Sequence, residues 1–310
     1  MKAMHCIAFI FYKSAMLEHI LRGDFSNFQS HLYKASSKLE FWLFTTWISL
    51  IAINLTMMFR VADHVDEIAI QILTWAVAVI LVIRNRHHFK LETTPSAIAI
   101  GTLLIIWMLI KSLFTRKVND ILFILTPIAA TIGLALIASG WKGLKQYWQP
   151  ILLAATLGIP VPFLFSALEK VIPVNEYTAQ FANSVLWYGG AKVVQEGITI
   201  ASQFGSVLVG RGCAGLPPIL MLLRIALMFV LVFPVTRLHM WIMFISAVAI
   251  AFIVNSCRVA LLVIISQQTD VFHYWHDGDG SQIFSVIAVS IFLGLSNWLT
   301  QDDGDEYEEE

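Results

Sequence analysis

Three residues in the C-terminal third of the sequence could together support acyl transfer: Cys213, Arg258 and His276. Cys213 lies in GRGCAGLPP, directly before an apolar stretch, and prolines such as Pro217 and Pro218 are favoured in the first turn of a helix. A thiol near a helix N-terminus meets free N–H groups and the positive end of the dipole, which favour a thiolate. A thiolate is the nucleophile that acyl transfer needs. The alternative interpretation is that Cys213 is a small buried hydrophobic residue, as free cysteines often are.

The second residue, Arg258 in NSCRVALL, lies inside a long apolar stretch, about eight residues and so roughly 12 Å from its C-terminal end. A cation at that depth in a membrane is costly, which makes it a candidate for function. Asn255 precedes it by one helical turn and shares its face. The alternative is a structural arginine that reaches toward the headgroups. Arg224, in LMLLRIALM, is a second such residue, for which we expect a structural role.

The third residue, His276, precedes the last apolar stretch in a segment of turn residues, HDGDGS. His273 is a rival for the role of base, because it lies one helical turn earlier. Asp277 and Asp279 could orient either imidazole, or they could simply be turn residues beside the neighbouring glycines.

Composition points to a protein that lies mostly in a membrane. Hydrophobic residues make up 58% of the 310 residues and charged residues only 13%, with a mean hydropathy of +0.74. Soluble domains carry about twice that share of charged residues, roughly a quarter. The net charge of −1 comes with no basic arm or helix, which gives no reason to expect nucleic acid as a partner. The three cysteines, Cys6, Cys213 and Cys257, are too few and too scattered to predict a disulfide framework or a zinc site. We therefore expect no metal and no cofactor.

The elements that must position these residues are apolar stretches of about 17–25 residues, the length that spans a bilayer as a helix. The sequence predicts an all-α polytopic membrane protein with about eight transmembrane helices and a small extracytoplasmic insertion between spans five and six. The predicted spans are 41–59, 68–83, 97–114, 121–139, 150–168, 216–234, 239–265 and 281–299.

These spans divide the chain into five regions. They are an N-terminal cytoplasmic or interfacial segment at 1–40, a five-span region at 41–168, the insertion at 169–215, a three-span region at 216–299 and an acidic cytoplasmic tail at 300–310. Residues 3–22 mix apolar and charged positions and predict an interfacial helix. Within the insertion, YTAQFANSVLWYGG predicts a short amphipathic helix, and the β-branched residues and glycines that follow predict a small hairpin.

The distribution of Lys and Arg among the short loops predicts the orientation in the membrane. The basic cluster RNRHHFK at 84–90 is expected in the cytoplasm, and alternation places both termini on the same side. Arg116 and Lys117 fall on the opposite side and disagree with this orientation. We expect a multi-pass protein of the plasma (inner) membrane, and the majority of the basic loops predicts that the insertion and the loop 266–280 lie on its extracytoplasmic face. Cys213, Arg258 and His276 would then meet at that face.

Taken together, these residues resemble the exosortase/archaeosortase family, most closely its cyanobacterial branch. The family pattern is Cys-x-Gly at the head of one span, Asn-x-x-Arg on the next span and His before the last span. The pattern stands here as Cys213-Ala-Gly215, Asn255-Ser-Cys-Arg258, and His276 followed by Gly280 and Phe284. The resemblance covers residues 170–299, and it departs from the family at Ala214, where the family usually has serine.

The resemblance implies a membrane cysteine peptidase or transpeptidase. Such enzymes cleave C-terminal sorting signals of the PEP-CTERM type, each with a short Pro-Glu-Pro-type motif, a membrane span and basic residues. They transfer the membrane-anchored protein to an acceptor on the outer face, which is a lipid, a glycan amine or water. Their partners are therefore this substrate, the acceptor and the lipid bilayer.

By the same resemblance, Cys213 would be the nucleophile, Arg258 would stabilise the oxyanion or the substrate carbonyl, and His276 would be the general acid and base. Gly215, Asn255 and Gly280 would support them.

Two functions from other classes stay open. A transporter or channel could bind an anionic solute through Arg224 and Arg258, and a scaffold could bind a partner through 169–215. Both should tolerate the loss of Cys213, whereas a thiol enzyme should not.

Overall fold

The computed structural model describes residues 39–61, 65–114, 121–210, 212–213 and 215–306. The predicted interfacial helix at 3–22, Cys6 and the end of the acidic tail lie outside the described residues. The chain divides into two compact units between Ala52 and Ile53, and the helix α4 crosses that boundary. The helices from α5 onward, the sheet and the candidate site all belong to the second unit.

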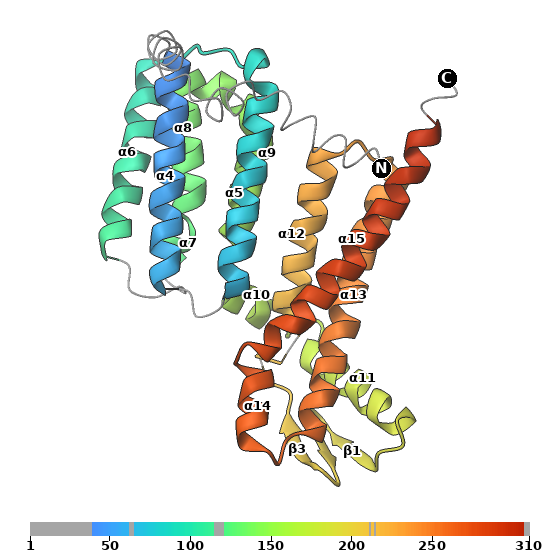
Figure 1. Cartoon of the computed structure of the whole chain (residues 1–310). Coiled ribbons are helices and arrows are strands. Elements are labelled where there is room, and N and C mark those ends of the chain that lie inside the picture. The colour runs from blue at the N-terminus through green and yellow to red at the C-terminus, as the bar shows by residue number, and fades with distance from the viewer. Residues whose placement is uncertain (1–38, 62–64, 115–120, 211, 214, 307–310) are drawn as a thin grey trace, which may run out of the picture. The chain divides into compact units, whose positions relative to one another are not determined.

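The described part of the chain is mostly helical (Figure 1). Its first half contains α4 (Leu39–Val61), α5 (Val65–Asn85), the 3₁₀ turn η1 (Arg86–His88), α6 (Pro95–Phe114), α7 (Ile121–Ile124), α8 (Thr126–Gly143), η2 (Leu144–Tyr147), α9 (Trp148–Leu157) and α10 (Val161–Leu168). Its second half contains α11 (Val174–Tyr188), β1 (Val193–Glu196), β2 (Thr199–Ser202), β3 (Gly205–Leu208), α12 (Leu216–Val232), α13 (Arg237–Ile264), α14 (Thr269–His276) and α15 (Gly280–Glu306).

The prediction of an all-α polytopic membrane protein is confirmed. Among the described residues, six helices are long and apolar enough to cross a membrane: Leu39–Arg60, Asp66–His88, Pro95–Phe114, Leu122–Leu157, Arg237–Ile264 and Thr269–Thr300. The shorter apolar helix α12 has 17 residues, slightly fewer than the roughly 20 that cover the hydrocarbon core. The predicted count of eight spans is therefore approximate.

The fourth and fifth predicted spans differ most from the expected continuous helices. Gly140 has φ +64°, and η2 separates α8 from α9, so that the two helices fold back and pack against each other. The predicted span 150–168 is then broken after Leu157. Pro160 causes the break, because proline lacks an N–H group and disfavours helical backbone at the residue before it. Two sequence stretches that are apolar throughout thus form four helices, α7, α8, α9 and α10.

The insertion 169–215 contains more structure than the predicted helix and hairpin. The helix is α11, and the hairpin is a three-stranded antiparallel sheet in the order β1-β2-β3. The register pairs Gln195 with Ile200 and Ile200 with Val207. Gly205 has φ +130°, and an added Cβ would meet Ser266 Oγ, so glycine is required where β3 approaches the end of α13.

The insertion is held by the last two turns of α13. A buried core joins α11, the sheet and this helix end, and it includes Leu186, Ile200, Val259, Val263 and also Cys213. In Figure 1, α13 runs beside α12 and continues past it to the sheet and α11. The 28 residues of α13 therefore serve two purposes, because one part spans and the other part forms the core of the insertion.

Candidate active site

The structure brings together the predicted nucleophile and the predicted base. Cys213 Sγ lies 3.2 Å from His276 Nε2, although 63 residues separate them along the chain. Cys213 is buried, with 4% of its surface exposed, and its N–H donates a hydrogen bond to Gly210 O at 3.0 Å. A sulfur–nitrogen contact of this length allows direct transfer of the thiol proton to the imidazole.

Cys213 is placed by the start of α12, as the two prolines indicate. Gly215 is the residue that caps α12, and the prolines occupy its first turn. A Cβ added at Gly215 would lie 3.6 Å from Asn255 Nδ2, which is an ordinary contact. Crowding therefore gives no reason for glycine at this predicted supporting position. Ala214, where the family pattern departs, lies outside the described residues.

His276 is the last residue of α14, an eight-residue helix where the sequence suggested only turn residues. Its Nδ1 lies 2.6 Å from Asp277 Oδ1, and the ring of Phe272 stacks on it at 5.2 Å with an interplanar angle of 14°. An Nδ1–H that donates to a carboxylate leaves the lone pair of Nε2 facing the thiol. Asp277 therefore holds the His276 ring with Nε2 toward Cys213 Sγ.

His273, the rival base, points elsewhere. Its side chain is 67% exposed, and its Nδ1 lies 3.7 Å from Asp277 Oδ2. The geometry therefore favours His276 over His273. Phe272 is a further residue that sequence reasoning missed, and its position one helical turn before His276 on an amphipathic segment is the signal that could have identified it.

Asn255 and Arg258 bind the backbones of Cys213 and His276. Asn255 Nδ2 donates to Cys213 O at 2.8 Å, and Arg258 Nη2 donates to His276 O at 2.6 Å. Arg258 Nε also faces Trp275 O at 3.5 Å. Among the described residues, Arg258 Nη1 has no hydrogen-bond partner and could still bind a substrate oxygen.

Gly280, the last supporting residue, begins α15 where this helix crosses α14. A Cβ added at Gly280 would lie 2.6 Å from the ring of Tyr274 and 3.0 Å from Trp275. Phe284, one turn later, places its ring 5.9 Å from that of Trp275. Gly280 is therefore required for the close approach of the two helices, and this approach fixes the residues directly before His276.

The electrostatics of Cys213 differ from the expectation. Burial raises the pKa of the Cys213 thiol, and this effect outweighs the positive charge of Arg258, which lowers the pKa. The negative charge of Asp277 adds to the increase. The sequence indicated a helix N-terminus that would favour a thiolate, but it could not show that the sulfur is withdrawn from water. A raised pKa favours the neutral thiol, so a reaction at this sulfur would need a base, and His276 Nε2 is the group in contact with it.

Arg224, the second arginine in an apolar helix, takes part in a different contact. Its Nη2 donates to Thr156 O near the end of α9 at 2.8 Å, and it makes none of the contacts described above for the candidate active site. In the described part of the chain, no three His, Cys, Asp or Glu side chains gather into a group that could hold a metal ion.

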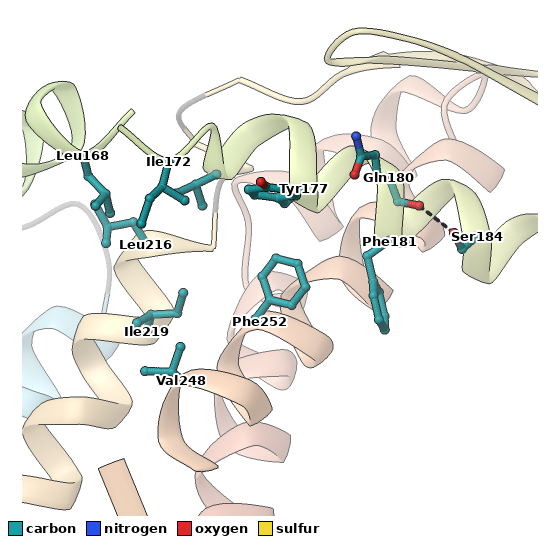
Figure 2. A pocket seen from close by; sticks show the side chains of 11 residues that line it. Leu168, Ile172, Tyr177, Gln180, Phe181, Ser184, Leu216, Ile219, Val248 and Phe252 are labelled. Atoms are coloured by element: carbon teal, nitrogen blue, oxygen red, sulfur yellow. Dashed lines mark hydrogen bonds between the residues drawn. The ribbon is translucent and has the colours of Figure 1, made fainter. Parts of the chain in front are cut away.

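An apolar groove of about 630 Å³ begins beside the candidate active site. Figure 2 shows α11 on one side of it and α12 and α13 on the other. Leu216, which follows Cys213 by three residues, and Phe252, one turn before Asn255, belong to its lining. The full lining is Leu168, Ile172, Val174, Tyr177, Gln180, Phe181, Ser184, Leu216, Ile219, Val248 and Phe252. A mostly apolar lining with a few polar groups is typical of a ligand site.

Comparison with known proteins gives one clear result. The sequence model of the transmembrane exosortase family matches residues 63–293, well over half of the chain and the part that contains every candidate residue described above. No curated protein and no solved structure matches significantly.

Proposed function

The chain belongs to the transmembrane exosortase family, and we propose that it is a membrane cysteine transpeptidase with Cys213 as its nucleophile and His276 as its base. The observation that carries this proposal is the 3.2 Å contact between Cys213 Sγ and His276 Nε2. Asp277 on the other imidazole nitrogen completes the sequence of nucleophile, base and orienting carboxylate that activates a thiol.

The chemistry follows from the order of these contacts. The thiol proton moves to His276 Nε2 as Sγ attacks the scissile carbonyl carbon, and the carbonyl oxygen becomes an oxyanion. Arg258 Nη1 would stabilise that oxyanion, because a fixed charge is effective where water is scarce. His276 then gives its proton to the leaving amide nitrogen, and a thioester remains on Cys213. An acceptor amine or water attacks the thioester, and its proton returns through His276 to the thiolate.

For the substrate, we propose exported proteins with C-terminal sorting signals of the PEP-CTERM type, which the enzyme cleaves and passes to an acceptor on the outer face. The charge asymmetry of the loops supports an extracytoplasmic site. The groove beside Leu216 supports a substrate whose scissile bond is followed by an apolar segment. The acceptor would be a lipid or glycan amine, or water in a hydrolytic reaction.

The structure gives no support to the alternative of an anion transporter. The guanidinium groups of Arg224 and Arg258 donate to backbone carbonyl oxygens of separate helix ends. The two guanidinium groups thus serve separate contacts and do not converge on one shared anion site.

Loss of the thiol provides the test. Cys213→Ala and His276→Ala should accumulate in the membrane as the wild type does, yet leave a co-expressed sorting-signal protein at its uncleaved length on a gel. Cys257→Ala is the matched control, because Cys257 is also a free cysteine but is exposed on α13, and it should cleave normally. Normal cleavage by Cys213→Ala would refute the proposal.

A further inference from the structure

One turn of α13 holds the backbones of both reacting residues. Asn255 and Arg258 are three residues apart, so they lie on the same face of the helix, about 4.5 Å apart along its axis. Asn255 binds the carbonyl oxygen of Cys213, and Arg258 binds the carbonyl oxygen of His276. The two catalytic residues come from different segments, the turn before α12 and the end of α14. Because both backbones bind to the same turn of α13, that turn determines how far apart Cys213 and His276 lie.

The hold on Cys213 is a single buried hydrogen bond. Asn255 is 4% exposed, and its amide is neutral, so its effect on the site is geometric rather than electrostatic. Removing the donor would leave the Cys213 carbonyl without this partner in a buried site, which is unfavourable. The turn around Cys213 contains several glycines, at positions 210, 212 and 215. Glycine gives the backbone many alternative conformations, so this turn depends on an external anchor.

Arg258 binds His276 through two guanidinium nitrogens that face the C-terminal end of α14. The last carbonyl groups of a helix have no partner within the helix, and they carry its negative end. Arg258 Nη2 and Nε face two of these groups in α14, His276 O at 2.6 Å and Trp275 O at 3.5 Å. A planar guanidinium suits two consecutive carbonyl groups, whereas an ammonium offers a single point charge.

The turn of α13 that carries Asn255 and Arg258 is held rigidly by packing. Val259 and Val263, which follow Arg258 on α13, are fully buried in the core that this helix shares with the sheet and α11. The helix therefore cannot shift without disrupting that core. Asn255 therefore fixes the position of the turn at Cys213, and Arg258 fixes the position of the end of α14.

We propose that Asn255 and Arg258 are positioning residues that together set the distance between Cys213 Sγ and His276 Nε2. This inference rests on the proposed function, because it assigns a role to the contact that carries it. It goes beyond an oxyanion role for Arg258, since it requires Asn255 equally and applies before any substrate binds.

The test measures how strongly His276 promotes the reactivity of Cys213, independently of any sorting-signal substrate. Full-length chain in lipid nanodiscs is treated with iodoacetamide at pH 7, and the alkylation rate of Cys213 is obtained by mass mapping. The ratio of this rate with His276 to the rate with His276→Ala is the coupling. Because each ratio compares two proteins with the same anchor, any change in access to the buried thiol affects both rates.

In the wild-type background, we expect a coupling of about tenfold or more, since a positioned base increases the thiolate fraction. In the Asn255→Asp and Arg258→Lys backgrounds, the ratio should fall close to one. Asn255→Asp keeps the side-chain shape but replaces the N–H donor by a carboxylate oxygen, and Arg258→Lys keeps the charge but not the fork. Ser256→Ala is the matched control, because Ser256 is buried on the same turn and its hydroxyl donates to Phe252 O of its own helix. Its coupling should equal that of the wild type.

A second measurement adds a pH signature. When the carboxylate that Asn255→Asp introduces is protonated, it regains an O–H donor for the Cys213 carbonyl. The coupling in Asn255→Asp, relative to the wild type at the same pH, should therefore rise as pH falls. Wild-type coupling in both anchor backgrounds would overturn the proposal, and loss with Arg258→Lys alone would overturn the shared role of Asn255. A ratio near one in the wild type would instead refute the Cys213–His276 pair of the proposed function itself.

Discussion

Arg258 and Arg224 make the same kind of contact in two regions of the molecule. Each lies within an apolar helix and donates to backbone carbonyl oxygens near the C-terminal end of another helix. They differ in what the helix end carries. Arg258 binds the end of α14, whose last residue is His276, whereas Arg224 binds α9 at Thr156. An arginine at membrane depth is therefore not by itself evidence of a reaction.

The sequence explains why Arg224 binds Thr156 O. In a continuous helix, the carbonyl of Thr156 would accept a hydrogen bond from the residue four positions later, which is Pro160. Proline has no N–H group, so Thr156 O needs another donor, and Arg224 supplies it. Arg84 does the same for the end of α12, where it donates to Leu231 O and Val232 O. In this fold, Arg84, Arg224 and Arg258 each donate to backbone carbonyl groups at the end of a helix.

The largest expected effect separates the two arginines directly. Arg258→Lys should leave sorting-signal cleavage about 10²–10³-fold slower, because loss of one oxyanion donor alone costs that much, and a lysine cannot hold two carbonyl groups as a fork. The measurement is substrate processing on a gel, normalised to enzyme abundance in the membrane. Cleavage at the wild-type rate would remove the difference between Arg258 and Arg224.

The comparison also shows how far the sequence could lead. Apolar stretches predicted most of the spanning helices, and three short motifs predicted Cys213, Arg258 and His276, which the structure brings together. The partners of Arg258 were not predictable, because they are backbone atoms at the end of a helix, in a segment that the sequence indicated was a turn. The raised pKa of Cys213 was also missed, because burial in the core of the insertion depends on long-range packing with residues such as Ile200 and Val263. Pro160 could have predicted the break, but the span 150–168 was predicted from its apolar composition alone.

A smaller effect is expected where α14 meets α15. Gly280→Ala would place a Cβ 2.6 Å from the Tyr274 ring and 3.0 Å from the Trp275 ring, so we expect these two rings and the end of α14 to shift, and His276 with them. Misplacement of a reacting group by about 1 Å can slow a reaction up to roughly 10²-fold, and we expect a loss of cleavage of about tenfold or more. Gly294→Ala is the matched control on the same helix, because a Cβ there meets nothing within 4 Å. Equal cleavage by the two variants would show that the close approach does not position His276.

The pH dependence of Cys213 reactivity offers a finer comparison of the arginines. Burial raises the pKa of the Cys213 thiol and Arg258 lowers it, so alkylation of Cys213 should accelerate as pH rises above neutrality. Removing the positive charge with Arg258→Gln destabilises the thiolate, and the midpoint of the pH–rate curve should move to higher pH. Arg224→Gln should leave the midpoint unchanged, since no effect of Arg224 contributes to the shift at Cys213. The rates are obtained by mass mapping of alkylated Cys213, and a downward shift with Arg258→Gln would contradict the assignment.

The smallest expected effect is that of Arg224→Lys, and its smallness is informative. Arg224 Nη2 has one acceptor, Thr156 O at 2.8 Å, whereas the buried Nε has no hydrogen-bond partner among the described residues. A lysine can supply one donor to one carbonyl and removes the unsatisfied Nε, so cleavage per enzyme molecule should stay close to that of the wild type.

Arg224→Met removes the donor and leaves Thr156 O unpaired in apolar surroundings, at a cost of about 1–3 kcal/mol. It should therefore lower the thermal unfolding midpoint in nanodiscs, whereas the fraction that stays folded should still cleave. Loss of cleavage in Arg224→Lys at normal abundance would show that both arginines serve the reaction and that the contrast between the two helix ends is wrong.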